Sequence, residues 1–299
     1  MNFKEFIKFV AERIGKVLGD DYRIESTSVR KNNGVNLSAL IIRCKDDQVT
    51  PVVYMEPLYD SYKNGSSIDR IVHKIVARLE DEKAFSLELI GQTKSFEAAR
   101  EHIAYRLVSR KENEELLKDV PWTAWNDLAI IYYLHLGTKD GNQITSIIHN
   151  WQQKAWNLST NELHELAKEN TPKLCPSTIG RLSHMVFELD EDDELVLDDT
   201  EIPTLYVLTN QAGINGATCM LYDNVLKEFA DKMDSDLIIL PSSIHEVLLL
   251  EYDEFSGDME LEKFKDMVGE VNRNDVPVED VLSDSVYIYE RKDNRIRIA

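Results

Sequence analysis

The first third of the chain alternates between helix-like and strand-like spacing of its hydrophobic residues. Apolar residues three and four apart over residues 3–18 predict an amphipathic helix. Two alternating stretches then flank Asn33-Gly34, a dipeptide typical of tight hairpin turns because both residues tolerate positive φ. Residues 50–55 (TPVVYM) predict a third strand, and Ser67 is placed to cap a further helix.

Strands dominate the middle of the predicted chain. A charged segment, 111–118, predicts a short helix, and Ser159-Thr160-Asn161-Glu162 is a capping box that opens a longer one. The strands expected around these helices are HIAYRLVSR (102–110), DLAIIYYLHLG (127–137) and QITSIIH (143–149), the last two paired across a turn.

The last third again combines helix-like and strand-like spacing of its hydrophobic residues. TLYVLTN (204–210) and GATCMLY (216–222) predict a hairpin around the turn QAGIN, and Asp223 or Asn224 precedes a helix. Two short strands, 236–240 and 246–252, come next, and VYIYER (286–291) closes as a strand. A helix over residues 258–272 lies between the strand 246–252 and this last strand, and its predicted buried face consists of Leu261, Phe264, Val268 and Val271. Hairpins alternating with helices, without a regular βαβ period, predict an α+β fold of mainly antiparallel sheets with flanking helices.

Composition narrows the class of protein. A chain of 299 residues with 43% hydrophobic content is long enough for one large or two ordinary folded domains. No apolar run approaches the ~20 residues that cross a membrane, and charges interrupt the N-terminus where a signal peptide needs an apolar core. The three cysteines, Cys44, Cys175 and Cys219, lack CxxC spacing. We therefore expect a cytoplasmic protein with reduced thiols and without a metal or cofactor.

Charge is distributed unevenly along the chain. The net charge is −20, yet residues 1–187 hold 25 acids and 25 bases. Residues 188–201 hold nine acids and no base, residues 228–290 hold 18 acids and four bases, and the last nine residues carry +3. This shift suggests two lobes, 1–187 and an acidic 188–299, with one continuous unit as the alternative. An acidic surface disfavours nucleic acid as a partner and favours a basic protein.

A polar cluster interrupts the strands near the end of the chain. In LPSSIHEV, Ser242, Ser243, His245 and Glu246 follow Pro241 within five residues. We interpret the cluster as a turn whose hydroxyls satisfy backbone amides, and keep its side chains as candidate ligand or partner contacts. Two asparagines on either side of the QAGIN turn complete this candidate set, Asn210 and Asn215.

Catalytic motifs are incomplete. His245-Glu246 lacks the second histidine of HExxH, because position 249 is Leu. No G-x-S-x-G elbow surrounds the serines, so Ser243 and His245 form at most half of a triad. Cys175 and Arg181 have the C-x5-R spacing of cysteine phosphatases, but a predicted helix rather than a strand precedes the cysteine. A hydrolase that uses either pair therefore remains an alternative.

Two long stretches carry a family resemblance. The segment LYVLTNQAGINGATCMLYDNVLKEFADKMDSDLIILPSSIHEVLLLEYDE, together with EVNRNDVPVEDVLSDSVYIYER, resembles a bacterial family known only as a domain of unknown function. The opening KNNGVNLSALIIR…VTPVVYMEPLYDSYKNG resembles the start of the same family. The resemblance implies one family unit along nearly the whole chain and implies no activity, cofactor or catalytic residue.

The leading hypothesis is a non-enzymatic binding or regulatory protein with an acidic C-terminal surface. The hydrolase is the first alternative. The second is an acidic surface that imitates nucleic acid and occupies a basic DNA-binding protein.

Overall fold

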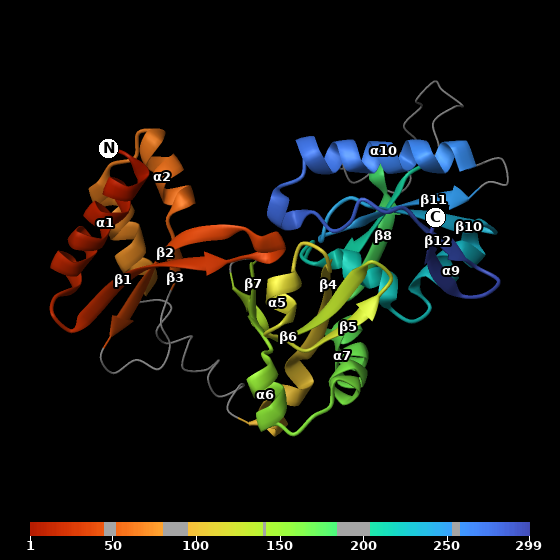
Figure 1. The fold of residues 1–299 in the computed structure, drawn as a ribbon, viewed down its shortest axis with the longest axis horizontal. Coiled ribbons are helices and arrows are strands. Elements are labelled where there is room, and N and C mark those ends of the chain that lie inside the picture. Colours follow the sequence, from red (N-terminus) through yellow and green to blue (C-terminus); the bar gives the residue numbers. More distant parts are fainter. Residues whose placement is uncertain (45–51, 80–94, 140–141, 184–203, 253–257) are drawn as a thin grey trace. The chain divides into compact units, whose positions relative to one another are not determined.

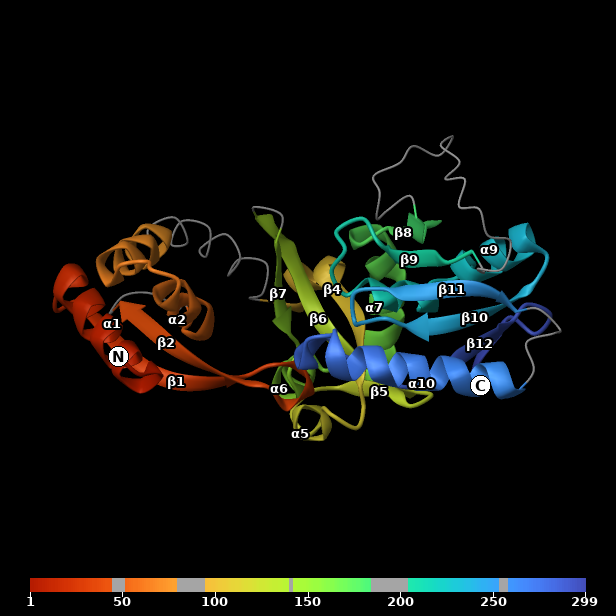
Figure 2. The ribbon, with the colours of Figure 1, turned by 90° about the horizontal axis from the view of Figure 1, so that it is seen from above.

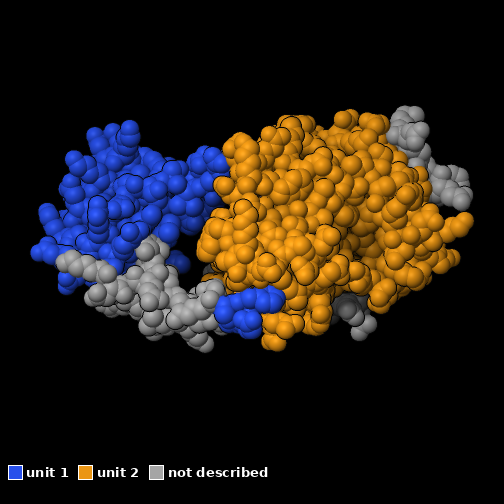
Figure 3. Space-filling model, turned by 60° about the horizontal axis from the view of Figure 1, so that its bottom comes forward, with its two compact units in different colours: residues 1–98 blue, residues 99–299 orange. Residues whose placement is uncertain are grey.

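A computed structural model describes residues 1–44, 52–79, 95–139, 142–183, 204–252 and 258–299 (Figure 1). These residues form helices and three antiparallel sheets, so the predicted α+β class is confirmed. The chain divides into two compact units, Met1–Ala98 and Ala99–Ala299, which Figure 3 distinguishes by colour. The predicted lobe boundary at residue 188 and the acidic run 188–201 lie outside the described residues.

The N-terminal unit is a hairpin sheet with helices, as the hydrophobic pattern predicts. At the hairpin, Asn33 and Gly34 have φ values of 55° and 70°. The core joins α1 and a helix over residues 68–79 to the sheet through Phe6, Val10, Ile14, Leu40 and Ile71. The elements are α1 (Phe3–Leu18), β1 (Tyr22–Arg30), β2 (Asn36–Cys44), β3 (Val52–Tyr54), α2 (Glu56–Lys63) and the helix 68–79 that Ser67 caps.

The C-terminal unit begins with a four-stranded sheet of order β4-β6-β5, in which β7 also pairs with β6. The amides of Tyr105 and Leu107 on the edge strand β4 donate to the hydroxyls of Thr171 and Thr218. These two hydroxyls therefore block an edge that could pair with another strand. Helix α4 (Phe96–Ala99) contains the boundary between the two units. The elements that follow it are β4 (Ile103–Ser109), α5 (Glu114–Leu117), β5 (Trp122–Trp125), β6 (Leu128–Lys139), β7 (Asn142–Ile147), α6 (Asn150–Ala155) and α7 (Thr160–Leu174).

A six-stranded antiparallel sheet of order β13-β12-β10-β11-β9-β8 completes this unit. Pairing of β8 with β9 links the chain on either side of the acidic run. The elements are β8 (Ser177–Arg181), β9 (Tyr206–Asn210), α9 (Val225–Met233), β10 (Asp236–Pro241), β11 (Val247–Tyr252), α10 (Asp258–Asn274), β12 (Tyr287–Glu290) and β13 (Arg295–Ile298).

Helices lie on opposite faces of this six-stranded sheet (Figures 1 and 2). Leu240 and Leu250 pack with Leu261 and Val268 of α10. On the other face, Phe229 of α9 packs against Tyr206, with ring centroids 5.0 Å apart. Tyr206 pairs with Leu249, the neighbour of Leu250, and successive strand residues point to opposite faces.

One predicted strand is wrong. GATCMLY is not the second strand of a hairpin, because Gly216–Leu221 (η3) forms a 3₁₀ helix. Residues 216–220 are buried in every position, so the segment is apolar without being extended. A short run of buried apolar residues has no period that separates a strand from a buried turn.

Asp127 joins the two sheets of the C-terminal unit. It lies between β5 and β6, and its carboxylate accepts hydrogen bonds from the hydroxyls of Ser283 (2.6 Å), Ser285 (3.1 Å) and Tyr287 (2.7 Å). Burial raises the pKa of the Tyr287 phenol, so this hydroxyl keeps its proton and remains a donor. The three bonds fix the β5–β6 turn against β12.

Candidate functional site

The polar cluster of residues 242–246 forms a turn between β10 and β11. The Ser243 amide donates to the Glu246 carbonyl (3.2 Å), and the His245 amide donates to Ser243 Oγ (3.0 Å). The predicted role of the hydroxyls as turn acceptors is thus visible for Ser243. The hydroxyl oxygen of Ser243 accepts a hydrogen bond from the backbone of the turn.

His245 connects this turn to two distant segments. The Asn215 amide donates to Nδ1 at 3.2 Å, and Nε2 lies 3.3 Å from Asp280 Oδ1. Since Nδ1 accepts a hydrogen bond, Nε2 carries the proton that faces the carboxylate. Both ring nitrogens are therefore engaged, and neither remains as a base for Ser243.

Asn210 and Asn215 belong to the loop that packs against the turn. Asn210 Oδ1 accepts from the amides of Ala212 (3.0 Å) and Ile214 (3.3 Å), and its Nδ2 donates to the Ile214 carbonyl (2.7 Å). Asn215 adopts a left-handed conformation with φ 56°. The structure thus brings Asn210 and Asn215 next to the turn of residues 242–246. These two asparagines shape the loop that contacts the turn.

Gly216 makes this close packing possible. A Cβ atom there would lie 2.2 Å from Thr209 Oγ1, 2.5 Å from the His245 carbonyl oxygen and 2.7 Å from the Asn210 nitrogen. Two of these three atoms are backbone, so no side-chain rotation relieves the contact. The loop and the turn can meet only because residue 216 has no side chain.

Ser242 differs from the other candidates because it lines a groove. Ser242 Oγ lies 3.5 Å from Glu246 Oε1, at the limit of a hydrogen bond. Ser242 also lines an apolar cavity of about 290 Å³ between α10 and the sheet, which we call the α10 groove. The groove is lined chiefly by Leu240, Leu248 and Leu250 of the strands and by Phe264, Met267 and Val271 of α10.

The predicted buried face of α10 is only partly covered. Leu261 and Val268 are buried, whereas Met267 and Val271 are 45% and 37% exposed. The prediction that Val271 is buried is therefore wrong, because the sheet reaches under one side of the helical stripe only. The apolar spacing was a signal for the groove, but it could not show which part of the stripe stays open.

Cys175 and Arg181 do not form a phosphate-binding loop. Cys175 is 5% exposed, and burial raises the pKa of its thiol. Residues Ser177–Arg181 form β8, whose backbone pairs with β9, and an extended strand places Arg181 about 13 Å beyond Ser177. A reactive cysteine needs an accessible thiolate with a lowered pKa, and this thiol has neither property.

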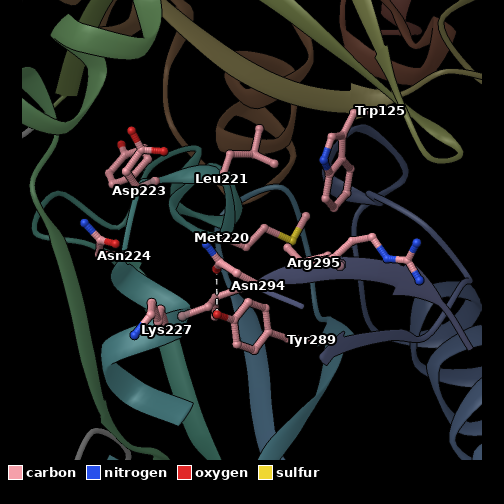
Figure 4. A pocket seen from close by; sticks show the side chains of 12 residues that line it. Trp125, Met220, Leu221, Asp223, Asn224, Lys227, Tyr289, Asn294 and Arg295 are labelled. Atoms are coloured by element: carbon pink, nitrogen blue, oxygen red, sulfur yellow. Dashed lines mark hydrogen bonds between the residues drawn. The ribbon is translucent and has the colours of Figure 1, made fainter. Parts of the chain in front are cut away.

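A second cavity, of about 560 Å³, lies on the face of the six-stranded sheet that points away from α10. Figure 4 shows the side chains that line it. The cavity is formed by Trp125 at the end of β5, the η3–α9 segment, Tyr289 of β12, and the start of β13. We call it the Trp125 pocket. Sequence reasoning missed it, although the basic charge of the last nine residues, which supply Arg295, was a signal.

The described part of the chain contains neither a group of metal-ligating side chains nor a membrane-spanning helix. There, no three His, Cys, Asp or Glu side chains are grouped so as to hold a metal ion. No helix in the described part of the chain is long and apolar enough to cross a membrane.

Comparison with known proteins gives one result of wide coverage. Residues 3–291 match the model of a family described as "Family of unknown function (DUF5688)". No curated protein and no solved structure matches the chain. The comparisons thus extend the resemblance seen in the sequence and add no activity to it.

Proposed function

The chain belongs to DUF5688, a family of unknown function, and we propose from its own residues that it is a non-enzymatic binding protein. In this proposal the α10 groove receives a basic, amphipathic helical segment of a partner protein. The single observation that carries it is the apolar stripe of α10, which remains open along one side within an acidic region of the chain.

The size of the groove favours side chains over a free ligand. Small-molecule sites commonly enclose ~300–1,000 Å³, and this groove, at about 290 Å³, lies at the lower limit. Its lining is almost wholly apolar, with Ser242 and Asn272 as the polar residues. Such a groove suits two or three apolar side chains that a helix projects at i, i+3 or i+4, and i+7.

The exposed residues of α10 also suit a protein partner. Met267 and Val271 stand one helical turn apart and are 45% and 37% exposed. Methionine adapts to different apolar surfaces because its side chain is flexible and polarisable. Exposed apolar residues that are contiguous with a groove are typical of interaction sites.

The surrounding charge selects a basic partner. Residues 258–284, which include α10 and the segment that follows it, hold nine acids and three bases. Glu270 is exposed on α10 beside Val271, and Glu246 lies at the Ser242 end of the groove. Opposite charge around an apolar centre increases the association rate and excludes acidic competitors.

The cytoplasm is the compartment we propose for this binding. Cys44, Cys175 and Cys219 are all free thiols. Free cysteines are typical of proteins in a reducing compartment.

The alternatives have less support. The hydrogen bonds of His245 and the burial of Cys175 give no basis for hydrolysis at either candidate pair. An imitation of nucleic acid needs an array of exposed acids and has no use for an apolar groove. Of the three hypotheses, only the helix-binding one uses both the charge and the groove.

Binding of a model peptide tests the proposal. The probe is a fluorescently labelled helical peptide with leucine at i, i+3 or i+4, and i+7 and lysine at its other positions, followed by fluorescence anisotropy. Two control peptides replace every lysine by glutamate or scramble the leucine positions. We expect saturable binding of the first peptide only, weakened but not abolished by salt, because part of the free energy is apolar.

Groove variants localise the binding. Met267→Ser and Val271→Ser should each weaken it about tenfold, since each removes apolar area from the contact. The matched control is Val278→Ser, because Val278 is 64% exposed and does not line the groove. Equal binding of the glutamate peptide, or an equal loss in Val278→Ser, would show that the groove is not the site. Binding that salt abolishes and DNA competes away would instead favour the nucleic-acid mimic.

A further inference from the structure

The Trp125 pocket has the dimensions of a small-molecule site, and nothing in the proposed function uses it. Its volume of about 560 Å³ falls within the usual range for ligand pockets. Segments far apart in the sequence converge on it, from Trp125 to Ile296 (Figure 4). Convergence of this kind is a property of the fold and not of one loop.

Neighbouring side chains hold the rings of Trp125 and Tyr289 in place. The Trp125 ring packs against Tyr287, with centroids 5.7 Å apart, and Tyr287 in turn binds Asp127. The Tyr289 hydroxyl donates to Asn294 Oδ1 at 2.7 Å. Fixed aromatic rings can stack on a flat ligand without losing conformational entropy of their own.

Hydrogen-bond donors dominate the polar lining. Arg295 uses Nη2 for Glu290 (3.0 Å), and Lys227 uses one of its protons for Asp231 (2.8 Å). A guanidinium carries five donor protons and an ammonium three, so both groups keep spare donors. Because Asn294 Oδ1 accepts from Tyr289, the Asn294 Nδ2 group adds two further donors.

Asp223 is the one acid among the described residues that line the pocket. Its Oδ1 meets Lys168 Nζ at 3.1 Å, and Lys168 is not part of the lining. The carboxylate can accept a hydroxyl or amino group of a ligand at the α9 end of the pocket. Its charge also disfavours highly charged anions there.

We infer that the Trp125 pocket binds a small organic anion that carries a flat ring. The ring stacks on Trp125, and Arg295 and Asn294 donate to the anionic group. This chemistry is shared by mononucleotides and by aromatic carboxylates, which differ in whether a phosphate or a carboxylate supplies the acceptor oxygens. The site is local and donor-rich within a chain whose net charge is −20.

Calorimetric titration of the whole chain tests the inference with four probes. Adenosine monophosphate and indole acetate each combine a ring with an anion. Adenosine supplies a ring alone, and inorganic phosphate supplies an anion alone. We expect saturable binding of at least one of the first two, with both single-feature probes at least about tenfold weaker.

Tryptophan side-chain NMR identifies the site. The chain has four tryptophans, and Trp125→Phe assigns the indole N–H signal of Trp125. The bound probe should shift that signal and leave those of Trp151 and Trp156 in place. A probe that binds with equal shifts at all four signals, or with none at Trp125, would contradict the inference.

Arg295→Ala and Arg297→Ala form a matched pair. Both arginines lie on β13 and both pair with Glu290, at 3.0 and 2.6 Å, but only Arg295 lines the pocket. Arg295→Ala should weaken binding about tenfold or more, whereas Arg297→Ala should leave it within about twofold. Equal losses in the two variants would assign the effect to the basic tail in general. Failure of all four probes up to millimolar concentration would overturn the inference and would leave the α10 groove proposal untouched.

Discussion

The two faces of the six-stranded sheet offer different chemistry to solvent. The face under α10 leaves an apolar groove with few polar atoms. The face under α9 leaves a pocket whose lining includes an indole, a guanidinium, an ammonium and two amides. Strand alternation supplies both, because Ile288 pairs with Ile238 towards α10 whereas Tyr289 pairs with Leu237 on the opposite side.

Helix length explains part of the difference. At 1.5 Å per residue, the 17 residues of α10 extend about 26 Å and the nine residues of α9 about 14 Å. The longer helix extends along its face and leaves an opening only beside its own apolar stripe. The shorter helix leaves the end of its face to the β12–β13 turn and to Trp125. In this unit the apolar groove thus lies beside α10, and the polar Trp125 pocket lies where α9 ends.

The largest expected effect concerns a residue on which both faces depend. Gly216→Ala places a Cβ within 2.7 Å of two backbone atoms, so the loop and the turn must move apart. We expect the free energy of unfolding to fall by about 3 kcal/mol, with weaker binding at the groove and at the pocket. Denaturant unfolding followed by circular dichroism measures the change.

The same substitution at Gly15 is the control. A Cβ there meets Cδ1 of Ile24 on β1 at 3.5 Å, which is an ordinary contact, so Gly15→Ala should stabilise α1 by about 1 kcal/mol. A Gly216→Ala protein as stable as the parent would refute the close packing of residues 210–217 against the turn.

A smaller effect should separate the two faces. Asp127→Ala removes the acceptor of three hydroxyls and should lower the free energy of unfolding by about 2 kcal/mol. Because Asp127 holds the turn after Trp125, this variant should weaken ligand binding at the pocket and leave peptide binding at the groove intact. Asp280→Ala removes the partner of His245 in the turn that carries Ser242, so it should weaken peptide binding at the groove and leave ligand binding at the pocket intact. Equal losses at both sites in either variant would mean that the faces are not independent.

The smallest expected effect is a pH dependence that belongs to neither face. Burial lowers the pKa of His135 and of His164, whose Nδ1 lies 3.1 Å from the Tyr132 hydroxyl. Below a pH of about 6.5 the unfolded chain takes up protons at these residues before the folded chain does. The free energy of unfolding should therefore fall as the pH decreases through this range, because the unfolded chain binds the protons more readily.

Denaturant midpoints at neutral and mildly acidic pH measure this dependence. His164→Gln should reduce it, whereas substitution of the exposed His73 by Gln should not. A midpoint that rises on acidification would contradict the assignment.

Local signals in the sequence located most elements. Asn33-Gly34 marked the N-terminal hairpin, and the capping box Ser159–Glu162 marked the start of α7, because both act through neighbouring backbone groups. The 3₁₀ helix at Gly216–Leu221 was mistaken for a strand, and β8 and β13 were not predicted. These short elements depend on partners that lie elsewhere in the chain.

The candidate site was predicted in part for the same reason. The sequence placed Ser242, Ser243 and His245 between two strands, which the structure shows, whereas Glu246 was expected to begin the second strand and instead precedes it. It could not reveal that Asn215 and Asp280 occupy the two nitrogens of His245, because these residues lie 30 and 35 positions away. It also could not show that Ser242 of this cluster lines an opening.

The sequence by itself determined the α+β class, the order of most helices and strands, and the acidic character of the last third. These properties follow from spacing, capping and composition, which act over a few residues. Only the tertiary structure decided which half of the α10 stripe stays exposed, and that Trp125, Lys227 and Arg295 share a pocket. Such sites are set by long-range packing, in which each side chain's surroundings come from segments that no local pattern specifies.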